Sequence, residues 1–368
     1  MIRVLNVISD SNVGGAGRVV LNYLYAADRA RFETHVAVPR GSLLKAPAEA
    51  LGSIVHEVDG LAERSFHPDD VRALSRLIRE LKPDVVHTHG ALSARIAAKR
   101  CGVRAIVMTK HCAAEPGNAA SRAAHKVLDA ALTDRMIAVT EAVKRQMIAA
   151  GTPERLISVV YNGIRLAEPY AGEQRDDLRE RLGMDTQHLW IGVAARLEPV
   201  KGVDRFVEAA KLLQKRDDLR FVVFGTGSEE AKLRELAAPL GDKLRFAGFT
   251  SEIEQALELL DLTVVPSHSE ACSLTVIESL SMGTPVCAFA IDGMDELVRD
   301  RENGALVPHN DVPALARAVE RLADDAALRA ELGENGRRMV REHLTAEAMA
   351  RQIEAVYTQT LAEKERRK

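Results

Sequence analysis

Two glutamates stand eight positions apart in the stretch EACSLTVIE, residues 270–278. The residues after Glu270 read as a short loop followed by a helix that starts near Ser273, a residue type that caps helices well. Glu278 then lies in the second helical turn, so the two acids do not share one helical face. Their spacing predicts that Glu270 and Glu278 contact two parts of one extended ligand.

A second group of residues has the chemistry to bind a diphosphate. In VAARLEPVKG, Arg196 and Lys201 follow a predicted strand and Gly202 opens the next helix. A guanidinium binds two phosphate oxygens at once, and an ammonium adds a point charge. The first-turn amides of Leu274 and Thr275 are further phosphate donors. Alone, the two cations read as surface charges of a loop, but together with these amides they predict a diphosphate grip.

A glycine-rich turn, SDSNVGGAG, follows the first predicted strand and leads into a helix. Glycines such as Gly15 let a ligand approach the helix amides, and a purely structural turn explains them equally well. A dinucleotide fingerprint is disfavoured because Val20 occupies the place of its third glycine. Arg40 also ends the second strand, where that fingerprint places an acid.

Two further strand ends offer contacts to a nucleotide. Gly225 follows the strand in VVFGTG, a common turn and a weak signal by itself. Phe249 and Thr250 follow the strand in LRFAGFT, where backbone groups are placed to read a base edge, although Phe249 also fits a core position.

Three histidines lie at strand ends in VVHTHG and VMTKHC. His87 is expected to be a hydrogen-bonded structural partner that points to the opposite face from His89. His111, beside Lys110 at a carboxyl end, is expected to face a ligand. No carboxylate accompanies these histidines in a way that predicts a metal site.

Short Val/Ile-rich runs alternate with helical segments in both halves of the chain, which is typical of parallel sheets covered on both faces. The runs are residues 2–8, 34–39, 85–89, 105–109, 135–140, 157–162, 189–195, 221–225, 244–249, 262–267, 285–290 and 305–308. The fold class is therefore α/β, with two doubly wound, Rossmann-like domains expected to face a central cleft. The expected divisions are an N-terminal domain 1–165, a linker 166–187, a C-terminal domain 188–345, and a helix 346–368 that packs back on the N-terminal domain.

Composition restricts the classes of function. The chain has 368 residues, 46% of them hydrophobic and 28% charged, with a net charge of -3. A soluble enzyme of two domains fits these values, and a nucleic-acid binder does not, because no basic block is present. The short apolar N-terminal run fits neither a signal peptide nor a membrane span, so a cytoplasmic location is expected. Four cysteines without CxxC spacing predict neither a zinc site nor a disulfide framework.

The combination of these motifs resembles the retaining glycosyltransferases of family 4, which have the two-domain GT-B fold. The resemblance rests on the turn at Gly14-Gly15, on His111, on Asn162-Gly163, on the R-x4-K-G loop from Arg196 to Gly202, on the E-x7-E pair, and on DGMDELVRDRENGALVPHND. The chain departs from the commoner pattern at Cys272, where an aromatic residue is usual, and at Ser273, where glycine is frequent.

The resemblance implies a role for each site residue. Arg196 and Lys201 neutralise the diphosphate of a nucleotide-sugar donor, and the amides of Leu274 and Thr275 touch its phosphate. Glu278 accepts hydrogen bonds from the ribose, and Glu270 contacts the donor sugar. His111 approaches the transferred sugar, and Gly15 lets the donor pass close to the N-terminal domain.

The resemblance also implies the reaction. A sugar moves with retention of configuration from a UDP-sugar or GDP-mannose to a glycan, lipid-linked or small-molecule acceptor, as in cell-surface polysaccharide synthesis. No cofactor and no metal is expected, since no Asp-x-Asp motif is evident. Peripheral contact with the inner face of a membrane is compatible with the sequence. The alternatives are a GT-B-type sugar-nucleotide epimerase, a non-catalytic nucleotide-sugar-binding protein, and a nicotinamide-dependent dehydrogenase, which the incomplete glycine fingerprint disfavours.

Overall fold

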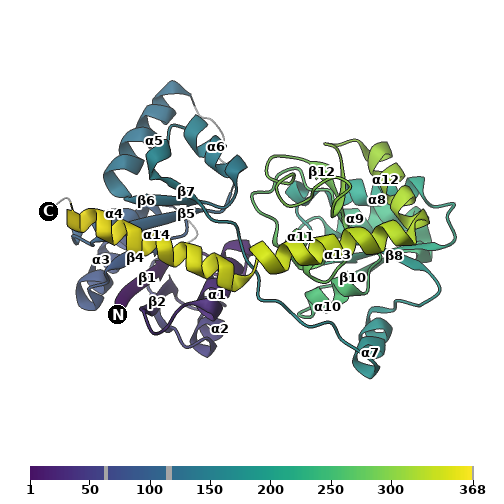
Figure 1. Ribbon diagram of the computed structural model, residues 1–368, viewed down its shortest axis with the longest axis horizontal. Helices are drawn as coiled ribbons and strands as arrows, with labels where there is room; N and C mark the ends of the chain where they lie inside the picture. Colours follow the sequence, from purple (N-terminus) through teal and green to yellow (C-terminus); the bar gives the residue numbers. More distant parts are fainter. Residues whose placement is uncertain (62–64, 113–117, 367–368) are drawn as a thin grey trace. The chain divides into compact units, whose positions relative to one another are not determined.

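The computed structural model describes residues 1–61, 65–112 and 118–366. The chain divides into two compact units (Figure 1). The first unit comprises Met1–Arg165 and Leu344–Lys368, and the second comprises Leu166–His343. Each unit is built on one parallel sheet with flanking helices, so the α/β, doubly wound fold class is confirmed.

The first unit contains a seven-stranded sheet in the order β3-β2-β1-β4-β5-β6-β7. Its strands are β1 (Ile2–Val7), β2 (Phe32–Pro39), β3 (Ile54–Val58), β4 (Val85–Thr88), β5 (Ala105–Lys110), β6 (Arg135–Ala138) and β7 (Ile157–Val159). Its helices are α1 (Gly15–Ala26), α2 (Lys45–Ala50), α3 (Pro68–Leu81), α4 (Leu92–Arg100), α5 (Ala119–Leu132), α6 (Glu141–Ala149) and α14 (Ala346–Arg366), with a 3-10 turn at Glu154–Leu156. The order reverses between β1 and β4, which makes this the switch point of the sheet.

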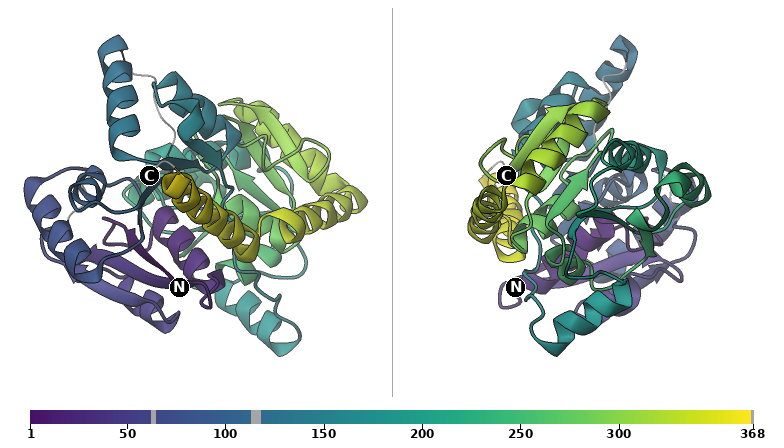
Figure 2. Two further views of the ribbon diagram at one scale, coloured as in Figure 1. Left: turned by 60° about the vertical axis from the view of Figure 1, so that its left-hand side comes forward. Right: turned by 90° about the vertical axis from the view of Figure 1, so that its right-hand side faces the viewer.

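The two faces of the first sheet carry different helices. Leu5, Val7 and Val86 pack in one core cluster with residues of α3 and α4. On the other face α14 lies beside α1 (Figures 1 and 2). Tyr357 of α14 is fully buried there, and Met349 Sδ accepts a hydrogen bond of 3.2 Å from the amide of Gly163.

The second unit contains a six-stranded sheet in the order β10-β9-β8-β11-β12-β13. Its strands are β8 (Leu189–Ala194), β9 (Leu219–Phe224), β10 (Leu244–Gly248), β11 (Leu262–Val265), β12 (Val286–Ala290) and β13 (Gly304–Pro308). Its helices are α7 (Glu173–Leu182), α8 (Val203–Leu212), α9 (Glu230–Ala237), α10 (Ile253–Glu258), α11 (Leu274–Ser281), α12 (Val312–Asp324) and α13 (Ala326–His343), with 3-10 turns at Pro199–Lys201 and Ala238–Lys243. Here the switch point lies between β8 and β11.

The stretch 166–187, which was expected to link the domains, contains α7. Leu178 and Leu182 of this helix are buried against Trp190 of β8 in one apolar cluster. Ile191 and Val193 of the same strand belong to the cluster on the opposite side of the sheet. This alternation along β8 shows that both faces of the second sheet are covered.

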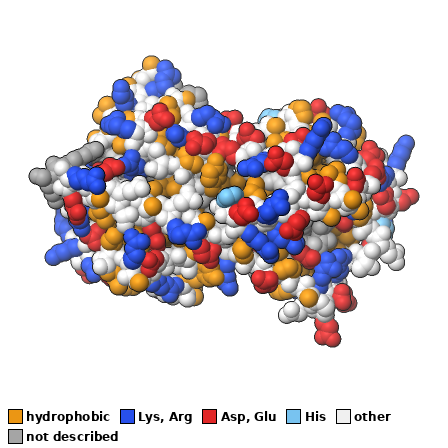
Figure 3. Space-filling view, in the orientation of Figure 1, with side chains coloured by type: hydrophobic (Ala, Val, Ile, Leu, Met, Phe, Trp, Pro, Cys, Tyr) orange, Lys and Arg blue, Asp and Glu red, His pale blue; other side chains and the backbone are white. Residues whose placement is uncertain are grey.

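The surface carries mixed charges. On the face shown in Figure 3, Lys and Arg side chains are interspersed with Asp and Glu side chains. Within the described part of the chain, none of the helices combines the length and the apolar character that crossing a membrane requires.

Candidate functional site

The predicted site residues of the second unit follow the carboxyl ends of its strands. Arg196 comes after β8, Gly225 directly after β9, Phe249 and Thr250 directly after β10, and Glu270 after β11. All strand pairs of this sheet are parallel, so these loops share one edge. Because β8 and β11 are neighbours, the loops after them meet at the switch point, where ligands of open α/β sheets bind.

Lys201 and Glu270 are in direct contact at this point. Lys201 Nζ lies 2.7 Å from Glu270 Oε1, and the hydroxyl of Ser267 donates to the same oxygen at 2.9 Å. Both side chains are mostly buried, with 22% of Lys201 and 13% of Glu270 exposed. The structure therefore brings the predicted diphosphate grip and the predicted sugar contact together.

Gly202 lets the Lys201 loop dock on the loop after β11. Its φ is 60°, in the left-handed region, and a Cβ at this position would lie 2.0 Å from the carbonyl oxygen of Pro266. The amide of His268 donates to the carbonyl of Val200 at 2.9 Å across the same junction. Only glycine permits this approach.

Arg196 lies on the same loop and is exposed. The nearby Glu198 carboxylate accepts a hydrogen bond of 2.6 Å from the hydroxyl of Ser228. This hydrogen bond holds the pKa of Glu198 below its ordinary value. The Arg196 guanidinium therefore lies at the carboxyl edge of the sheet, near the Glu198 carboxylate, which is hydrogen-bonded to Ser228.

Helix α11 begins at Leu274, as predicted, with Ser273 at its N-cap position. The Ser273 side chain makes no capping hydrogen bond, so the first-turn amides keep the capacity to bind an anion. Thr275 Oγ1 donates to the carbonyl of Ala194 at the end of β8, at 3.2 Å, which ties the helix start to the switch point. Glu278 is fully buried within the helix.

Gly225 and Phe249 shape the outer part of the same edge. The amide of Gly225 donates to the carbonyl of Gly248 at 2.7 Å. A Cβ on Gly225 would lie 1.9 Å from the carbonyl oxygen of Ala195, so this turn also requires glycine. Phe249 is 78% exposed, which excludes the core position that its sequence also allowed.

The first unit holds the remaining predicted residues. A Cβ on Gly15, the first residue of α1, would meet no atom within 4 Å, so packing does not demand glycine there. His111 directly follows β5, and its Nε2 lies 2.8 Å from His89 Nδ1. Burial lowers the pKa of His111 to about 4, with a further contribution from Lys110.

The prediction that His87 and His89 point to opposite faces is wrong. Their rings lie 4.4 Å apart. Residues i and i+2 of a strand share a face, and the alternation of β4 should have been applied in that way. His87 bonds Thr109 and Tyr357 through its two ring nitrogens, which agrees with its predicted structural role.

Two contacts were missed in the sequence. Ser267 bonds Glu270, and His89 bonds His111. The signal for His89 was its spacing of two from His87 on a strand. Among the described residues, no group of three or more His, Cys, Asp and Glu side chains is arranged to hold a metal ion.

Both units of the chain match known glycosyltransferase families. Residues 174–339 match the family described as glycosyl transferases group 1, and residues 13–168 match glycosyltransferase family 4. The chain is 32% identical over 309 residues to a D-inositol 3-phosphate glycosyltransferase of Thermomonospora curvata, covering 75% of this chain and 71% of that protein. It is 32% identical over 231 residues to an alpha-D-kanosaminyltransferase of Streptomyces kanamyceticus, covering 61% and 58%.

The match spans 58% to 64% of the length of several such relatives. Among solved structures, Anabaena Alr3699/HepE in complex with UDP and glucose aligns with a TM-score of 0.86 at 21% identity, covering 97% of this chain and 100% of that chain. This likeness shows the fold. The chain therefore belongs to the family 4, group 1 glycosyltransferases and has their GT-B fold.

Proposed function

We propose that this chain is a retaining glycosyltransferase that moves a sugar from a nucleotide-sugar donor to a glycan, lipid-linked or small-molecule acceptor. The observation that carries the proposal is the contact between Lys201 and Glu270 at the switch point of the second sheet, beside the start of α11. The similarity to an alpha-D-kanosaminyltransferase and to a D-inositol 3-phosphate glycosyltransferase supports the same class of reaction.

The second unit binds the donor. Arg196 and Lys201 neutralise the diphosphate, and the amides of Leu274 and Thr275 add hydrogen bonds to it. Each charge-assisted hydrogen bond of this kind contributes about 1.5 to 3 kcal/mol. Glu270, already within reach of Lys201, contacts the sugar that is attached to the diphosphate.

The nucleoside occupies the outer part of this carboxyl edge. Glu278 bonds the ribose hydroxyls from α11. The backbone groups of Phe249 and Thr250 read the base edge, and the exposed Phe249 ring offers it an apolar face. Gly225 leaves the backbone open to the ligand because it has no side chain. From the first unit, we assign His111 and Gly15 to the transferred sugar.

In the reaction, the bond between the anomeric carbon and the phosphate oxygen breaks, and the acceptor oxygen bonds the same face of that carbon. The acceptor proton passes to an oxygen of the leaving diphosphate, so no separate base is needed. Negative charge grows on the diphosphate, and Arg196, Lys201 and the helix amides stabilise it. These fixed cations supply the charge that a metal would supply, so we propose turnover in excess EDTA.

Thermal denaturation against a panel of nucleotides and nucleotide sugars tests the proposal. One nucleoside diphosphate and its sugar should raise the melting temperature, because a ligand that binds only the native state stabilises it. No shift with UDP, GDP, ADP, dTDP or their sugars would overturn the proposal.

A product assay separates the alternatives. With the stabilising donor and a mixture of sugar acceptors, the proposal requires a new glycoside of retained configuration. Release of an isomerised nucleotide sugar without acceptor would instead identify an epimerase. Binding without any turnover would identify a nucleotide-sugar-binding protein.

A further inference from the structure

His89 and His111 form a bonded pair at the carboxyl edge of the first sheet. Nδ1 of His89 lies 2.8 Å from Nε2 of His111, and the rings stack with centroids 5.1 Å apart. Burial lowers the pKa of both imidazoles, that of His111 to about 4, so both rings are neutral at pH 7. In a hydrogen bond between neutral imidazoles, one facing nitrogen carries the proton and the other accepts it. The tautomer of one ring therefore dictates that of the other.

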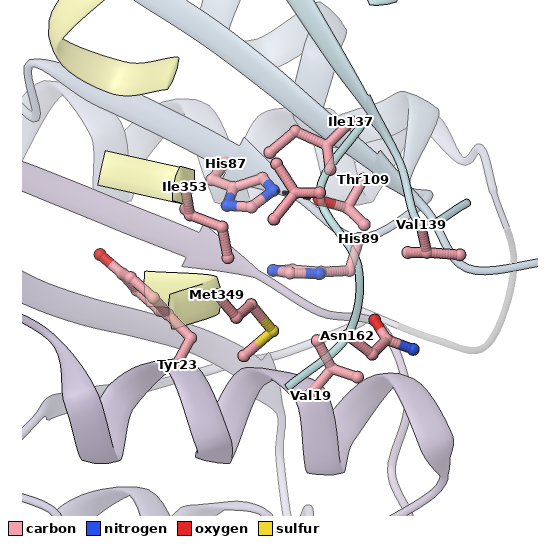
Figure 4. Close-up of a pocket in the computed structure, with 11 residues that line it drawn as sticks. Val19, Tyr23, His87, His89, Thr109, Ile137, Val139, Asn162, Met349 and Ile353 are labelled. Carbon is pink, nitrogen blue, oxygen red and sulfur yellow. Dashed lines mark hydrogen bonds between the residues drawn. The ribbon is translucent and has the colours of Figure 1, made fainter. Parts of the chain in front are cut away.

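The second nitrogen of His89 has no such partner. Its Nε2 is buried and bonds no atom in the part of the chain that the structure describes. The ring points into a cavity of about 10 Å³ (Figure 4). Most of the side chains that line this cavity are apolar, namely Val19, Ile137, Val139, Val160, Met349 and Ile353, and Tyr23, His87, Thr109 and Asn162 complete the lining. A cavity of this volume has room for about one water molecule and for no further side chain.

Fold stability does not account for an imidazole at position 89. A buried polar group that lacks a partner is destabilising, and an apolar side chain of similar size would avoid this loss. The neighbouring His87 is different, because its ring nitrogens bond Tyr357 Oη at 2.6 Å and Thr109 Oγ1 at 2.7 Å. His87 thus joins β4 to β5 and α14, whereas the one side-chain hydrogen bond of His89 among described residues goes to His111.

The mostly apolar lining of the cavity also favours one tautomer. Buried backbone N–H groups without an acceptor are rarer in proteins than buried carbonyl groups without a donor, and we apply the same preference to a ring N–H. A bare Nε2 on His89 places the proton of this ring on Nδ1, which then donates to His111 Nε2. His111 consequently carries its own proton on Nδ1.

We propose that His89 is a positioning residue that holds the His111 ring through its Nδ1–H and fixes His111 as the Nδ1–H tautomer. His111 then presents an N–H donor, and not an acceptor, to an oxygen of the transferred sugar. This last role rests on the proposed transfer reaction, whereas the tautomer of His111 does not depend on it.

Nuclear magnetic resonance of protein labelled with 15N-histidine tests the tautomer without substrate. The signals of His111 are identified as those that His111→Gln removes. In the unmodified protein, His111 should be protonated at Nδ1 and bare at Nε2. In His89→Leu the bare His111 Nε2 loses its donor, so its 15N signal should move toward that of a ring nitrogen without a hydrogen bond, and His89→Asn should keep the original signal, because its amide still donates. An Nε2–H form in the unmodified protein, or an unchanged His111 Nε2 signal in His89→Leu, would overturn the proposal.

Steady-state kinetics with the donor found by the panel tests the consequence. His89→Leu should lower kcat on the order of 10-fold or more, a loss typical of removing a residue that orients a site residue. The donor KM should not change, because the proposed donor contacts lie mainly in the second unit. His89→Asn should recover most of the loss. Ile353→Val enlarges the same cavity without touching the pair and should retain full turnover. Equal turnover in His89→Leu and Ile353→Val would contradict a positioning role. An unmodified protein inactive with every donor would count against the proposed function, and the resonance result would still decide the tautomer.

Discussion

Lys201 Nζ and Glu270 Oε1 are hydrogen-bonded at 2.7 Å, so the group assigned to the diphosphate and the group assigned to the sugar neutralise each other before any donor arrives. An incoming diphosphate must share Lys201 with Glu270 or displace it. With the proposed roles, the carboxylate should weaken binding of the bare nucleoside diphosphate, and this loss should be recovered only when Glu270 contacts the sugar. We therefore expect the pair to favour a complete donor over the spent nucleotide.

Glu270→Gln should separate these two effects. Loss of the negative charge releases Lys201 from this mostly buried ion pair. A gain of about 1 kcal/mol, the upper end for ion pairs at protein surfaces, corresponds to roughly 5-fold tighter binding of the nucleoside diphosphate. Turnover should nevertheless fall, because the sugar loses a charged contact. Titration calorimetry and initial rates measure the two quantities. Glu208→Gln, which removes the partner of Lys211 on α8, gives the same change of charge and should alter neither. Weaker nucleotide binding in Glu270→Gln would refute this account.

Lys201→Gln should reduce transfer far more than it reduces stability. The glutamine amide can still donate to Glu270, but the cation that stabilises the leaving diphosphate is lost. One charge-assisted hydrogen bond of about 1.5 to 3 kcal/mol corresponds to roughly a 10- to 150-fold loss of turnover. Lys201→Ala should abolish detectable transfer.

The matched control for Lys201→Gln is Lys211→Gln, a lysine of α8 that pairs with Glu208 outside the site. Urea unfolding, followed by the fluorescence of Trp190 in the second unit, checks that each variant is folded. Near-normal turnover in Lys201→Gln would remove the cation from the mechanism.

The sequence predicted those strands that are buried on both faces, because their apolar runs are continuous. All six runs of the second half are strands. β3 was missed because it is an edge strand, IVHEV, in which His56 and Glu57 interrupt the apolar run. That β3 is the edge strand follows from the order of strands in the sheet, which the sequence near β3 does not reveal.

The sequence placed the candidate site residues at strand ends but did not give the contacts between them. Lys201 and Glu270 meet because β8 and β11 are neighbours in the sheet, and strand order cannot be read from an alternation of strands and helices. Ser267 carried no motif and was found only through its bond to Glu270. His89 was within reach of the sequence, since strand periodicity alone places it on the face of His87.

Gly202→Ala should destabilise the second unit and weaken donor binding together. The left-handed backbone costs a non-glycine residue about 1 to 2 kcal/mol, and the added Cβ would press on the carbonyl of Pro266 at 2.0 Å, with a typical overpacking loss of about 1 to 3 kcal/mol. The loop that carries Lys201 must then move away from Glu270.

Gly248→Ala separates the two contributions. Gly248 also has a positive φ, of 73°, but a Cβ there would meet no atom within 4 Å, so only the backbone term applies. Urea unfolding can be followed by the fluorescence of Trp190, the single tryptophan of the sequence, which is buried. Gly202→Ala should have a lower free energy of unfolding than Gly248→Ala. Equal free energies would mean that the Lys201 loop does not rely on this close approach.

The buried histidines of the first unit should make stability fall with acid. Burial lowers the pKa of His87 to about 3 from its ordinary value of 6.5, and lowers that of His111 to about 4. Below pH 6.5 the unfolded chain binds protons that the native state does not bind until the pH reaches these lowered values. The free energy of unfolding is therefore fully present above pH 6.5 and decreases as the pH falls toward 4, by at most about 1.4 kcal/mol per pH unit for each group.

His87→Gln should remove one of these groups and flatten the dependence. Circular dichroism of urea unfolding at pH 7, 6 and 5 gives the slope, which should decrease by about 1 kcal/mol per pH unit relative to the unmodified protein. At pH 7 the variant should be less stable, because Tyr357 and Thr109 both lose an imidazole partner. His343→Gln, at a side chain that is 68% exposed, is the control and should keep the original slope. An identical slope in His87→Gln would mean that folding leaves the pKa of His87 unchanged, which its two short hydrogen bonds and its burial beside His89 argue against.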